Sequence, residues 1–199
     1  MNGSSAHSRQ HVDVSELSVK GADRDLRIEP LASAHDRAHF SSGVESLDTY
    51  LRTQAGQDIR RKANAVFVLV AAAQPANVLG YFTLCARALS QGDVPEPARK
   101  SIPRYPLVSA TLIGRLAVAK QSQGQGLGSI LLAQALQKAY ESASTVGSSM
   151  VVVDALDESA CGFYAAHGFV RLPDSMRLVL PIRSIEKLIG ELGAPTGSS

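Results

Sequence analysis

The chain has 199 residues, of which 45% are hydrophobic and 19% charged, and these values are ordinary for one globular domain. Two large domains and wholesale disorder are excluded, and no apolar run approaches the roughly 18 residues that a transmembrane helix needs. Because the N-terminus also lacks the apolar stretch of a signal peptide, a cytoplasmic protein is expected. Cys85 and Cys161 form neither a disulfide framework nor a metal-binding pattern, so no metal site is expected.

The formal net charge of +2 is unevenly distributed along the chain. From Arg52 to Arg115 there are nine Lys/Arg against three Asp/Glu, a local net charge of +6, which leaves −4 for all other residues. This asymmetry predicts one basic face. Such a face either binds a polyanion or is a solvated surface that happens to be rich in arginine.

The composition divides the chain into three parts. Residues 1–25 are polar and lack periodicity, and residues 191–199 are rich in Gly, Pro and Ser, so both are expected to be flexible tails. Residues 26–190 are expected to form one domain. It begins with a strand over 26–31 and a helix that ends near Arg61, and the capping-box spacing of Ser42 and Glu45 predicts where this helix starts.

The remaining elements of this domain follow in a clear order. Apolar runs at 66–73 and 78–89 predict an antiparallel hairpin, and the loop 90–106, with four prolines, is long enough to suggest a functional role. A strand (107–119), a glycine-rich turn, a helix, a buried strand (150–153), a short helix (158–166) and a final strand pair (169–172 with 176–180) complete it. We therefore expect an α/β protein of the α+β type, with a central mixed, mostly antiparallel twisted sheet flanked by helices and one right-handed parallel crossover.

The glycine-rich turn predicts a phosphate-bearing ligand. Glycines between a strand and a helix let backbone amides approach a phosphate, and the helix N-terminus adds a favourable dipole. Ser129 stands at the third glycine position of the dinucleotide fingerprint, and no lysine follows Gly128 as in a Walker loop, which disfavours both of those sites. A glycine turn without any ligand remains the alternative.

The turn Gln123-Gly124-Gln125-Gly126-Leu127-Gly128 resembles the acetyl-CoA loop Q/R-x-x-G-x-G/A of the GCN5-related N-acetyltransferases (GNAT). Gly80-Tyr81-Phe82, the run 114–118, Phe163-Tyr164 and Gly168-Phe169 follow the family's order, so the resemblance spans residues 28–180 and implies the GNAT fold. It implies that strand backbone pairs with the pantetheine arm of acetyl-CoA and that loop amides hold the pyrophosphate. The implied cofactor-binding residues are Leu116, Ala117, Val118, Gln123, Gly124, Gln125, Gly126, Leu127, Gly128, Ser129 and Phe163.

The same resemblance implies a catalytic role for Tyr164. Acetyl transfer from a thioester to an amine requires a neutral amine, stabilisation of an oxyanion and a proton for the departing thiolate. Tyr164 would supply that proton, and the Val118 N–H would polarise the thioester carbonyl. No general base is identified; Asp154, Asp157 and Glu158 either position the amine or cap the next helix. An α-amine, with a reference pKa near 8, needs no dedicated base.

A closer resemblance is to the toxin branch of this family, which acetylates the amino acid of aminoacyl-tRNA. It rests on Phe40-Ser41-Ser42-Gly43, Leu47-Asp48, the run 80–84, Ile102-Pro103-Arg104 and Val153-Asp154-Ala155. It implies a toxin that blocks translation, a homodimer and a ribbon-helix-helix antitoxin as partner. The basic residues assigned to tRNA phosphates are Arg52, Arg60, Arg61, Lys62, Arg87, Arg99, Lys100 and Arg104.

Two other functions remain open at this point. One is a GNAT enzyme that acetylates a protein N-terminus or a small-molecule amine, with an incidental basic face. The other is a non-catalytic regulator that binds acyl-CoA without turning it over.

Overall fold

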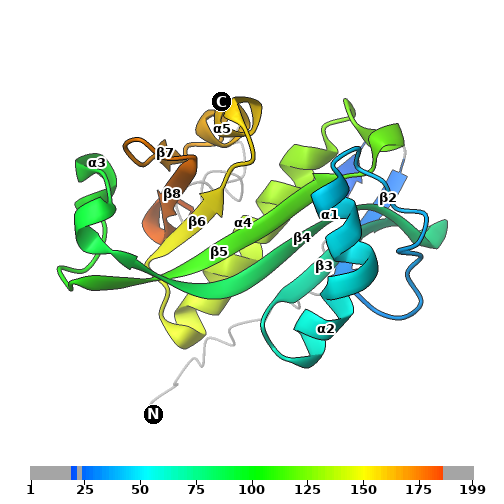
Figure 1. Cartoon of the computed structure of the whole chain (residues 1–199), viewed down its shortest axis with the longest axis horizontal. Coiled ribbons are helices and arrows are strands. Elements are labelled where there is room, and N and C mark those ends of the chain that lie inside the picture. The colour runs from blue at the N-terminus through cyan, green and yellow to red at the C-terminus, as the bar shows by residue number, and fades with distance from the viewer. Residues whose placement is uncertain (1–18, 22–23, 186–199) are drawn as a thin grey trace, which may run out of the picture.

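The computed structural model describes residues 19–21 and 24–185. Within that part the strands form one eight-stranded sheet in the order β1-β2-β3-β4-β5-β6-β8-β7 (Figure 1). Only the pair β5–β6 is parallel among these neighbours, which confirms the predicted mixed, mostly antiparallel sheet. The strands are β1 (Val19–Gly21), β2 (Arg24–Pro30), β3 (Ala65–Ala71), β4 (Gln74–Ser90), β5 (Leu107–Val118), β6 (Met150–Asp154), β7 (Val170–Arg171) and β8 (Arg177–Pro181).

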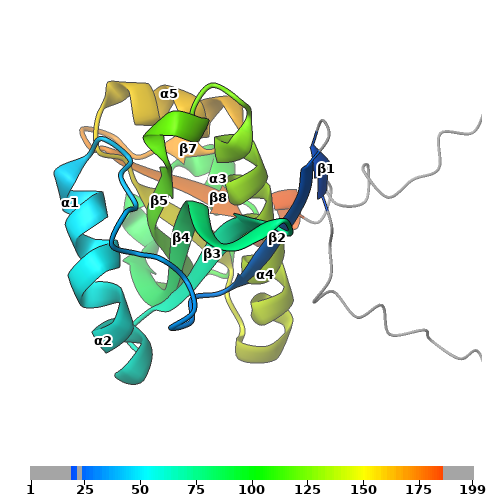
Figure 2. The same cartoon turned by 90° about the vertical axis from the view of Figure 1, so that its right-hand side faces the viewer.

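Helices cover both faces of this sheet, as Figures 1 and 2 show. The helix expected after the glycine turn and the short helix expected over 158–166 become α4 and α5 on one face and share the largest core with the sheet. On the other face, one cluster lies under α1, η2 and α2, and another lies under α3. The helices are α1 (Glu45–Thr49), the π-helical turn η2 (Tyr50–Gln54), α2 (Ala55–Arg60), the 3-10 turn η3 (Gln91–Asp93), α3 (Glu96–Arg99), the 3-10 turn η4 (Lys120–Ser122), α4 (Leu127–Val146) and α5 (Glu158–Ala166).

The edges of the domain differ partly from the expectation. Strand β1 lies within the stretch expected as a tail, and it pairs with β2, so the sheet begins before residue 26. Residues 1–18 and 186–199, which include the expected C-terminal tail, lie outside the described residues. No helix of the described part is both long and apolar enough to cross a membrane.

The predicted capping box at Ser42 and Glu45 is wrong. Val44 occupies the N-cap position of α1 and has no side-chain capping bond. The Ser42 hydroxyl donates instead to the Asp48 carboxylate (2.6 Å), and Glu45 accepts from Thr49 (2.7 Å). The charge-assisted bond from the Ser42 hydroxyl to the buried carboxylate of Asp48, one turn into the helix, is stronger than the neutral bond that the hydroxyl would accept in a capping box with Glu45.

The long proline-containing loop is folded back on the sheet. It forms η3 and α3, and Val94, Ala98 and Ile102 pack into the third core cluster with residues of β5, β6 and β8. Arg99 fixes this fold, because its guanidinium donates to the carbonyls of Val94 (2.8 and 3.0 Å) and Gly92 (3.1 Å). The loop is therefore a structured arm at the end of the β4–β5 ribbon (Figure 1).

Strand β5 is paired unequally with its two neighbours. Its ladder with β4 runs from Leu107 to Val118, whereas its parallel ladder with β6 runs only from Ala110 to Ile113. Strand β6 then continues with β8 alone, up to Asp154. Beyond Ile113, one edge of β5 has therefore parted from the sheet, which the sequence pattern of a strand, a glycine turn and a crossover helix does not by itself reveal.

An added methyl group should destabilise the fold at Gly80 but not at Gly162. A Cβ at Gly80 would lie 2.6 Å from Leu131 Cδ1 and 2.8 Å from the Ala117 carbonyl oxygen, so Gly80→Ala should destabilise the fold by about 1–3 kcal/mol. A Cβ at Gly162, inside α5, meets nothing within 4 Å, so Gly162→Ala should stabilise by about 0.5–1 kcal/mol.

Urea unfolding of the two variants beside the unchanged chain measures both effects. A Gly80→Ala variant as stable as the unchanged chain would contradict the close approach of β4, β5 and α4 at this point.

Candidate active site

The parted edge of β5 exposes backbone hydrogen-bonding groups. The Ala119 N–H donates to the Leu79 carbonyl (2.8 Å), and Val118 lies opposite Gly80 in the ladder. In an antiparallel pair, successive residues point their N–H and C=O groups to opposite edges. Leu116 and Val118 therefore direct these groups away from β4, toward the edge that β6 has left, whereas Ala117 directs its own toward Tyr81. Of the three strand residues predicted from the sequence, the structure brings two to this edge.

The glycine turn lies at the end of the same strand and begins α4. Gly124 and Gly126 have φ of +73° and +76°, and a Cβ at either would meet nothing within 4 Å, so the loop follows a left-handed path and leaves open space above it. Gly126 is the N-cap of α4 and has no side-chain capping bond. The amides of Leu127 and Gly128 begin the helix and lack an acceptor one turn earlier. These amides and the helix dipole fit the phosphates of acetyl-CoA.

Helix α5 brings two aromatic residues to this loop. A Cβ at Gly128 would lie 3.7 Å from Phe163 Cε2 and Cζ, so the Phe163 ring lies beside the start of α4. Tyr164 is 8% exposed and packs edge-on against Phe163 and Phe169, with ring centroids 5.2 and 5.5 Å apart. Burial raises the pKa of Tyr164 to about 12. The phenol is therefore protonated at neutral pH and is a donor, not a base.

Three other predicted loop residues use their polar groups within the protein. The Gln123 side-chain amide donates to the carbonyls of Ser42 (2.9 Å) and Val118 (3.1 Å), and that of Gln125 donates to Gln121 (3.4 Å). The Ser129 N–H donates to the Gly126 carbonyl (3.1 Å). The Ser129 amide thus has an acceptor inside the first turn of α4, and its contact with a phosphate stays a prediction.

His167 is a neighbour of this site that the sequence did not identify. Its Nδ1 lies 2.8 Å from the Phe163 carbonyl and its Nε2 lies 3.1 Å from Ser129 Oγ, while its ring packs on Phe163 at 4.6 Å between centroids. A carbonyl only accepts, so Nδ1 carries the proton and Ser129 donates to Nε2 when the ring is neutral. Histidine and serine are 38 residues apart, and no local pattern joins them.

The carboxylates that follow β6 are all engaged. Arg177 on the neighbouring strand β8 binds Asp154 through two bonds (2.6 and 3.1 Å), and Asp157 accepts from the Ala160 N–H as the N-cap of α5 (2.8 Å). Glu158 pairs with Arg171 (2.7 and 2.9 Å). Of the two roles that the sequence left open, capping holds for Asp157, and none of the three is a free base.

The eight predicted tRNA-binding residues fall into two groups on the structure. One lies along η2 and the end of α2, and the other lies on the arm formed by β4, α3 and the following loop; α2 and α3 cover the same face of the sheet at separate places (Figure 1). Arg52 pairs with Glu45 (3.1 Å) and Lys100 with Glu96 (3.7 Å), and Arg99 is bonded to carbonyls as described above. The exposed members with no ion pair within the described residues are Arg60, Arg61, Lys62, Arg87 and Arg104.

Arg115 lies between these two groups and was not among the predicted site residues. Its guanidinium carbon lies 3.6 Å from the centroid of the Tyr50 ring, and the Tyr50 hydroxyl donates to Asp58 (3.0 Å). The position of Arg115 one residue before Leu116 was the signal that could have found it. This cation–π contact links η2, which carries Tyr50, to the stretch of β5 that lies beyond its ladder with β6.

A family model described as an acetyltransferase (GNAT) domain matches residues 64–171. A curated relative, the tRNA-acetylating toxin of Mycobacterium tuberculosis, is 33% identical over 162 residues, which cover 81% of this chain and 95% of that protein. Residues 64–171, which the family model matches, contain β5, the glycine loop and Tyr164.

Solved structures of toxins have the same fold. AtaT complexed with acetyl-methionyl-tRNAfMet is 33% identical, with a TM-score of 0.76, and the match covers 83% of this chain and 99% of that one. An AtaT variant bound to the C-terminus of the antitoxin AtaR and to acetyl-CoA is 30% identical, with a TM-score of 0.71, and the match covers 83% and 98%. By its sequence, its fold and the geometry of its site, the chain belongs to the GNAT acetyltransferase family.

Proposed function

We propose that the protein is an acetyl-CoA-dependent N-acetyltransferase toxin that acetylates the α-amino group of aminoacyl-tRNA and thereby blocks translation. The observation that carries the proposal is the parted backbone edge of β5, which ends in the glycine loop, with Phe163 beside that loop and the protonated Tyr164 packed against Phe163. The similarity to a tRNA-acetylating toxin and to AtaT with acetyl-methionyl-tRNAfMet supports this acceptor. Acetyl-CoA, when bound, supplies the activated acetyl group as a thioester.

The chain's backbone binds and orients the donor in this proposal. Leu116 offers its outward N–H and C=O groups to the amide-containing pantetheine arm, as a neighbouring strand would, whereas the Val118 carbonyl is bonded to the Gln123 side chain (3.1 Å). The amides of Leu127 and Gly128 and the N-terminal dipole of α4 hold the pyrophosphate. At the reacting end, the Val118 N–H polarises the thioester carbonyl and stabilises the negative charge that develops on its oxygen as the amine attacks.

Tyr164 donates the proton that the departing thiolate needs. Its phenol is buried between two aromatic rings and keeps its proton because burial raises its pKa to about 12. The CoA thiolate is a weaker base than this phenolate, so the proton moves as the C–S bond breaks and not before it. The proton that the attacking nitrogen loses then restores the Tyr164 phenol. The attacking α-amine, with a reference pKa near 8, is partly neutral without a protein base.

The acceptor is held by the basic residues on the side of the sheet opposite α4. Arg60, Arg61 and Lys62 extend from the end of α2, and Arg87 and Arg104 extend from the arm, so two positive groups flank β4 and β5. Their spacing suits contacts with phosphates at separate points of one folded RNA. Few exposed aromatic side chains accompany them, so backbone contacts dominate over base stacking.

We further infer that the protein acts in the cytoplasm as a homodimer and that a ribbon-helix-helix antitoxin silences it. The AtaT variant bound to the C-terminus of the antitoxin AtaR supports an antitoxin partner. A basic surface that binds tRNA phosphates is also suited to an acidic segment of such a partner.

Transfer to charged tRNA tests the proposal. Purified protein is incubated with labelled acetyl-CoA and a total pool of aminoacyl-tRNA, with the same pool deacylated as the matched acceptor control. Label should appear on charged tRNA alone, as N-acetyl-amino acid released by mild alkali. Label only on added peptides or polyamines would support an acetyltransferase activity but contradict the toxin function. Binding of acetyl-CoA without label on any amine would indicate a non-catalytic regulator.

Tyr164→Phe provides the catalytic control in the same assay. It removes one hydroxyl and leaves the aromatic packing, so acetyl transfer should fall by about 10²–10⁴-fold while acetyl-CoA binding, measured by calorimetry, stays within about twofold. Equal loss of transfer and binding would show that Tyr164 only packs the core.

Substitution of the unpaired arginines tests the acceptor surface. The triple variant Arg60→Ala, Arg61→Ala and Arg104→Ala should raise the KM for aminoacyl-tRNA and flatten its dependence on salt, because fewer counterions are released on binding. The matched control is Arg27→Ala on β2, whose side chain is also exposed but pairs with Asp25 (3.3 Å). An unchanged salt slope in the triple variant would place the tRNA elsewhere.

A further inference from the structure

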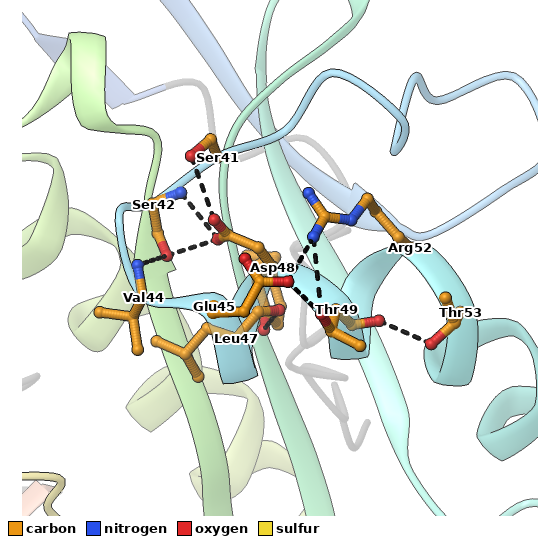
Figure 3. A network of polar contacts seen from close by, with 10 residues as sticks. Ser41, Ser42, Val44, Glu45, Leu47, Asp48, Thr49, Arg52 and Thr53 are labelled. Atoms are coloured by element: carbon orange, nitrogen blue, oxygen red, sulfur yellow. Dashed lines mark hydrogen bonds and ion pairs between the residues drawn. The ribbon is translucent and has the colours of Figure 1, made fainter.

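The segment between β2 and α1 contains Ser41 and Ser42, which the mechanism above does not use. Asp48 of α1 lies behind them and is only 3% exposed. Its carboxylate accepts hydrogen bonds from the Ser42 N–H (2.7 Å), the Ser42 hydroxyl (2.6 Å) and the Ser41 hydroxyl (3.1 Å) (Figure 3). One buried carboxylate therefore fixes the conformation of both serines.

The two serines are bonded in turn to the loop that follows β5. The Lys120 N–H donates to the Ser41 carbonyl (2.8 Å). The Gln123 side-chain amide donates to the Ser42 carbonyl (2.9 Å) and, with its second N–H, to the Val118 carbonyl (3.1 Å). Residues about 80 positions apart are thus joined at the point where the parted strand ends and the glycine loop begins.

The charge on Asp48 strengthens this connection. Burial alone would raise the pKa of Asp48, but hydrogen bonds from Ser42 and Ser41 outweigh it and hold the pKa below its usual range, so the group is a carboxylate at neutral pH. The peptide between Ser41 and Ser42 points its N–H at this carboxylate and its C=O at Lys120. A negative charge on the N–H side polarises the peptide and makes its carbonyl a better acceptor.

Val118 is held from two sides as a result. The peptide that follows it is bonded through the Ala119 N–H to Leu79 (2.8 Å) and through the Val118 carbonyl to Gln123. These two bonds fix the peptide that follows Val118, which is joined directly to the peptide that carries the Val118 N–H at the parted edge. A shift of about 1 Å at such a position is enough to weaken catalysis strongly.

We propose that Asp48 is a positioning residue for acetyl transfer, which acts through Ser42 and Gln123 to aim the Val118 N–H at the thioester carbonyl. This inference rests on the proposed acetyl-CoA-dependent transfer but not on the choice of acceptor. Asp48 touches neither donor nor acceptor in this account. Gln123, although it stands first in the glycine loop, serves through its side chain as the link between the two segments.

Infrared spectroscopy of bound acetyl-CoA, with carbon-13 in the acetyl carbonyl, tests the proposal without an acceptor. A hydrogen bond from Val118 lowers the carbonyl stretching frequency relative to free acetyl-CoA. The frequency should return toward the free value in Asp48→Ala and in Gln123→Ala. It should stay low in Asp48→Asn, whose side-chain oxygen still accepts from Ser42, and in Glu45→Ala, which removes an exposed carboxylate from the same helix (82% exposed).

Kinetics on the acceptor that the labelling assay identifies separate positioning from general damage. Asp48→Ala and Gln123→Ala should each lower kcat by about 10–100-fold with little change in the KM for the acceptor. Because both act through one chain of bonds, the double variant should be no slower than the slower single variant. Asp48→Asn should recover most of the rate.

Gln123→Ala keeps the test decisive if Asp48→Ala fails to fold, because Gln123 is exposed. An unchanged carbonyl band in folded Gln123→Ala loaded with acetyl-CoA would overturn the inference and leave acetyl transfer intact. Multiplicative rate losses in the double variant would overturn it as well. Transfer to an amine other than charged tRNA would overturn the toxin function alone.

Discussion

The site depends on one constraint: β5 is paired with β4 along one edge up to Val118, whereas its ladder with β6 along the other edge ends at Ile113. Backbone N–H and C=O groups left without partners inside a protein cost about 1–3 kcal/mol each, so a parted edge persists where something other than a strand can meet it. An extended ligand with amide groups of its own is suited to do so. The ladder alternation then decides that Leu116 and Val118, and not Ala117, face that open edge.

The two faces of the sheet carry different parts of the proposed site around this edge. On one face, α4 contributes uncapped amides at its start and α5 contributes a buried phenol, and both belong to the same core as the strands, which holds them in fixed relation. On the other face, Asp48 of α1 holds Ser41 and Ser42, which bond to the loop that follows β5, and the basic residues lie on η2, the end of α2 and the arm. In the proposed function, donor binding, proton donation and acceptor binding thus use different elements of the fold.

Much of this could be predicted from the sequence, because apolar periodicity and the glycine turn are local signals that tertiary packing reinforced. The predictions that failed concern contacts between residues far apart in the sequence, or residues for which two partners compete. Ser42 has capping spacing to Glu45, yet the buried Asp48 accepts its hydroxyl. Arg99 is basic and lies in the charged stretch, yet its guanidinium closes the arm on Val94 and Gly92. The contact of His167 with Ser129 joins residues whose proximity only the packing of α5 on α4 creates.

The most direct measurement of the central claim is an NMR titration of the nitrogen-15-labelled protein with acetyl-CoA, following individual backbone amides. The account predicts large shifts and slowed hydrogen exchange for the amides of Leu116, Val118, Leu127 and Gly128. The Ala117 amide, which faces β4, should change little. Shifts of equal size along 116–118, or none in the strand while the ligand binds elsewhere, would contradict the claim that the parted edge of β5 is the acetyl-CoA site.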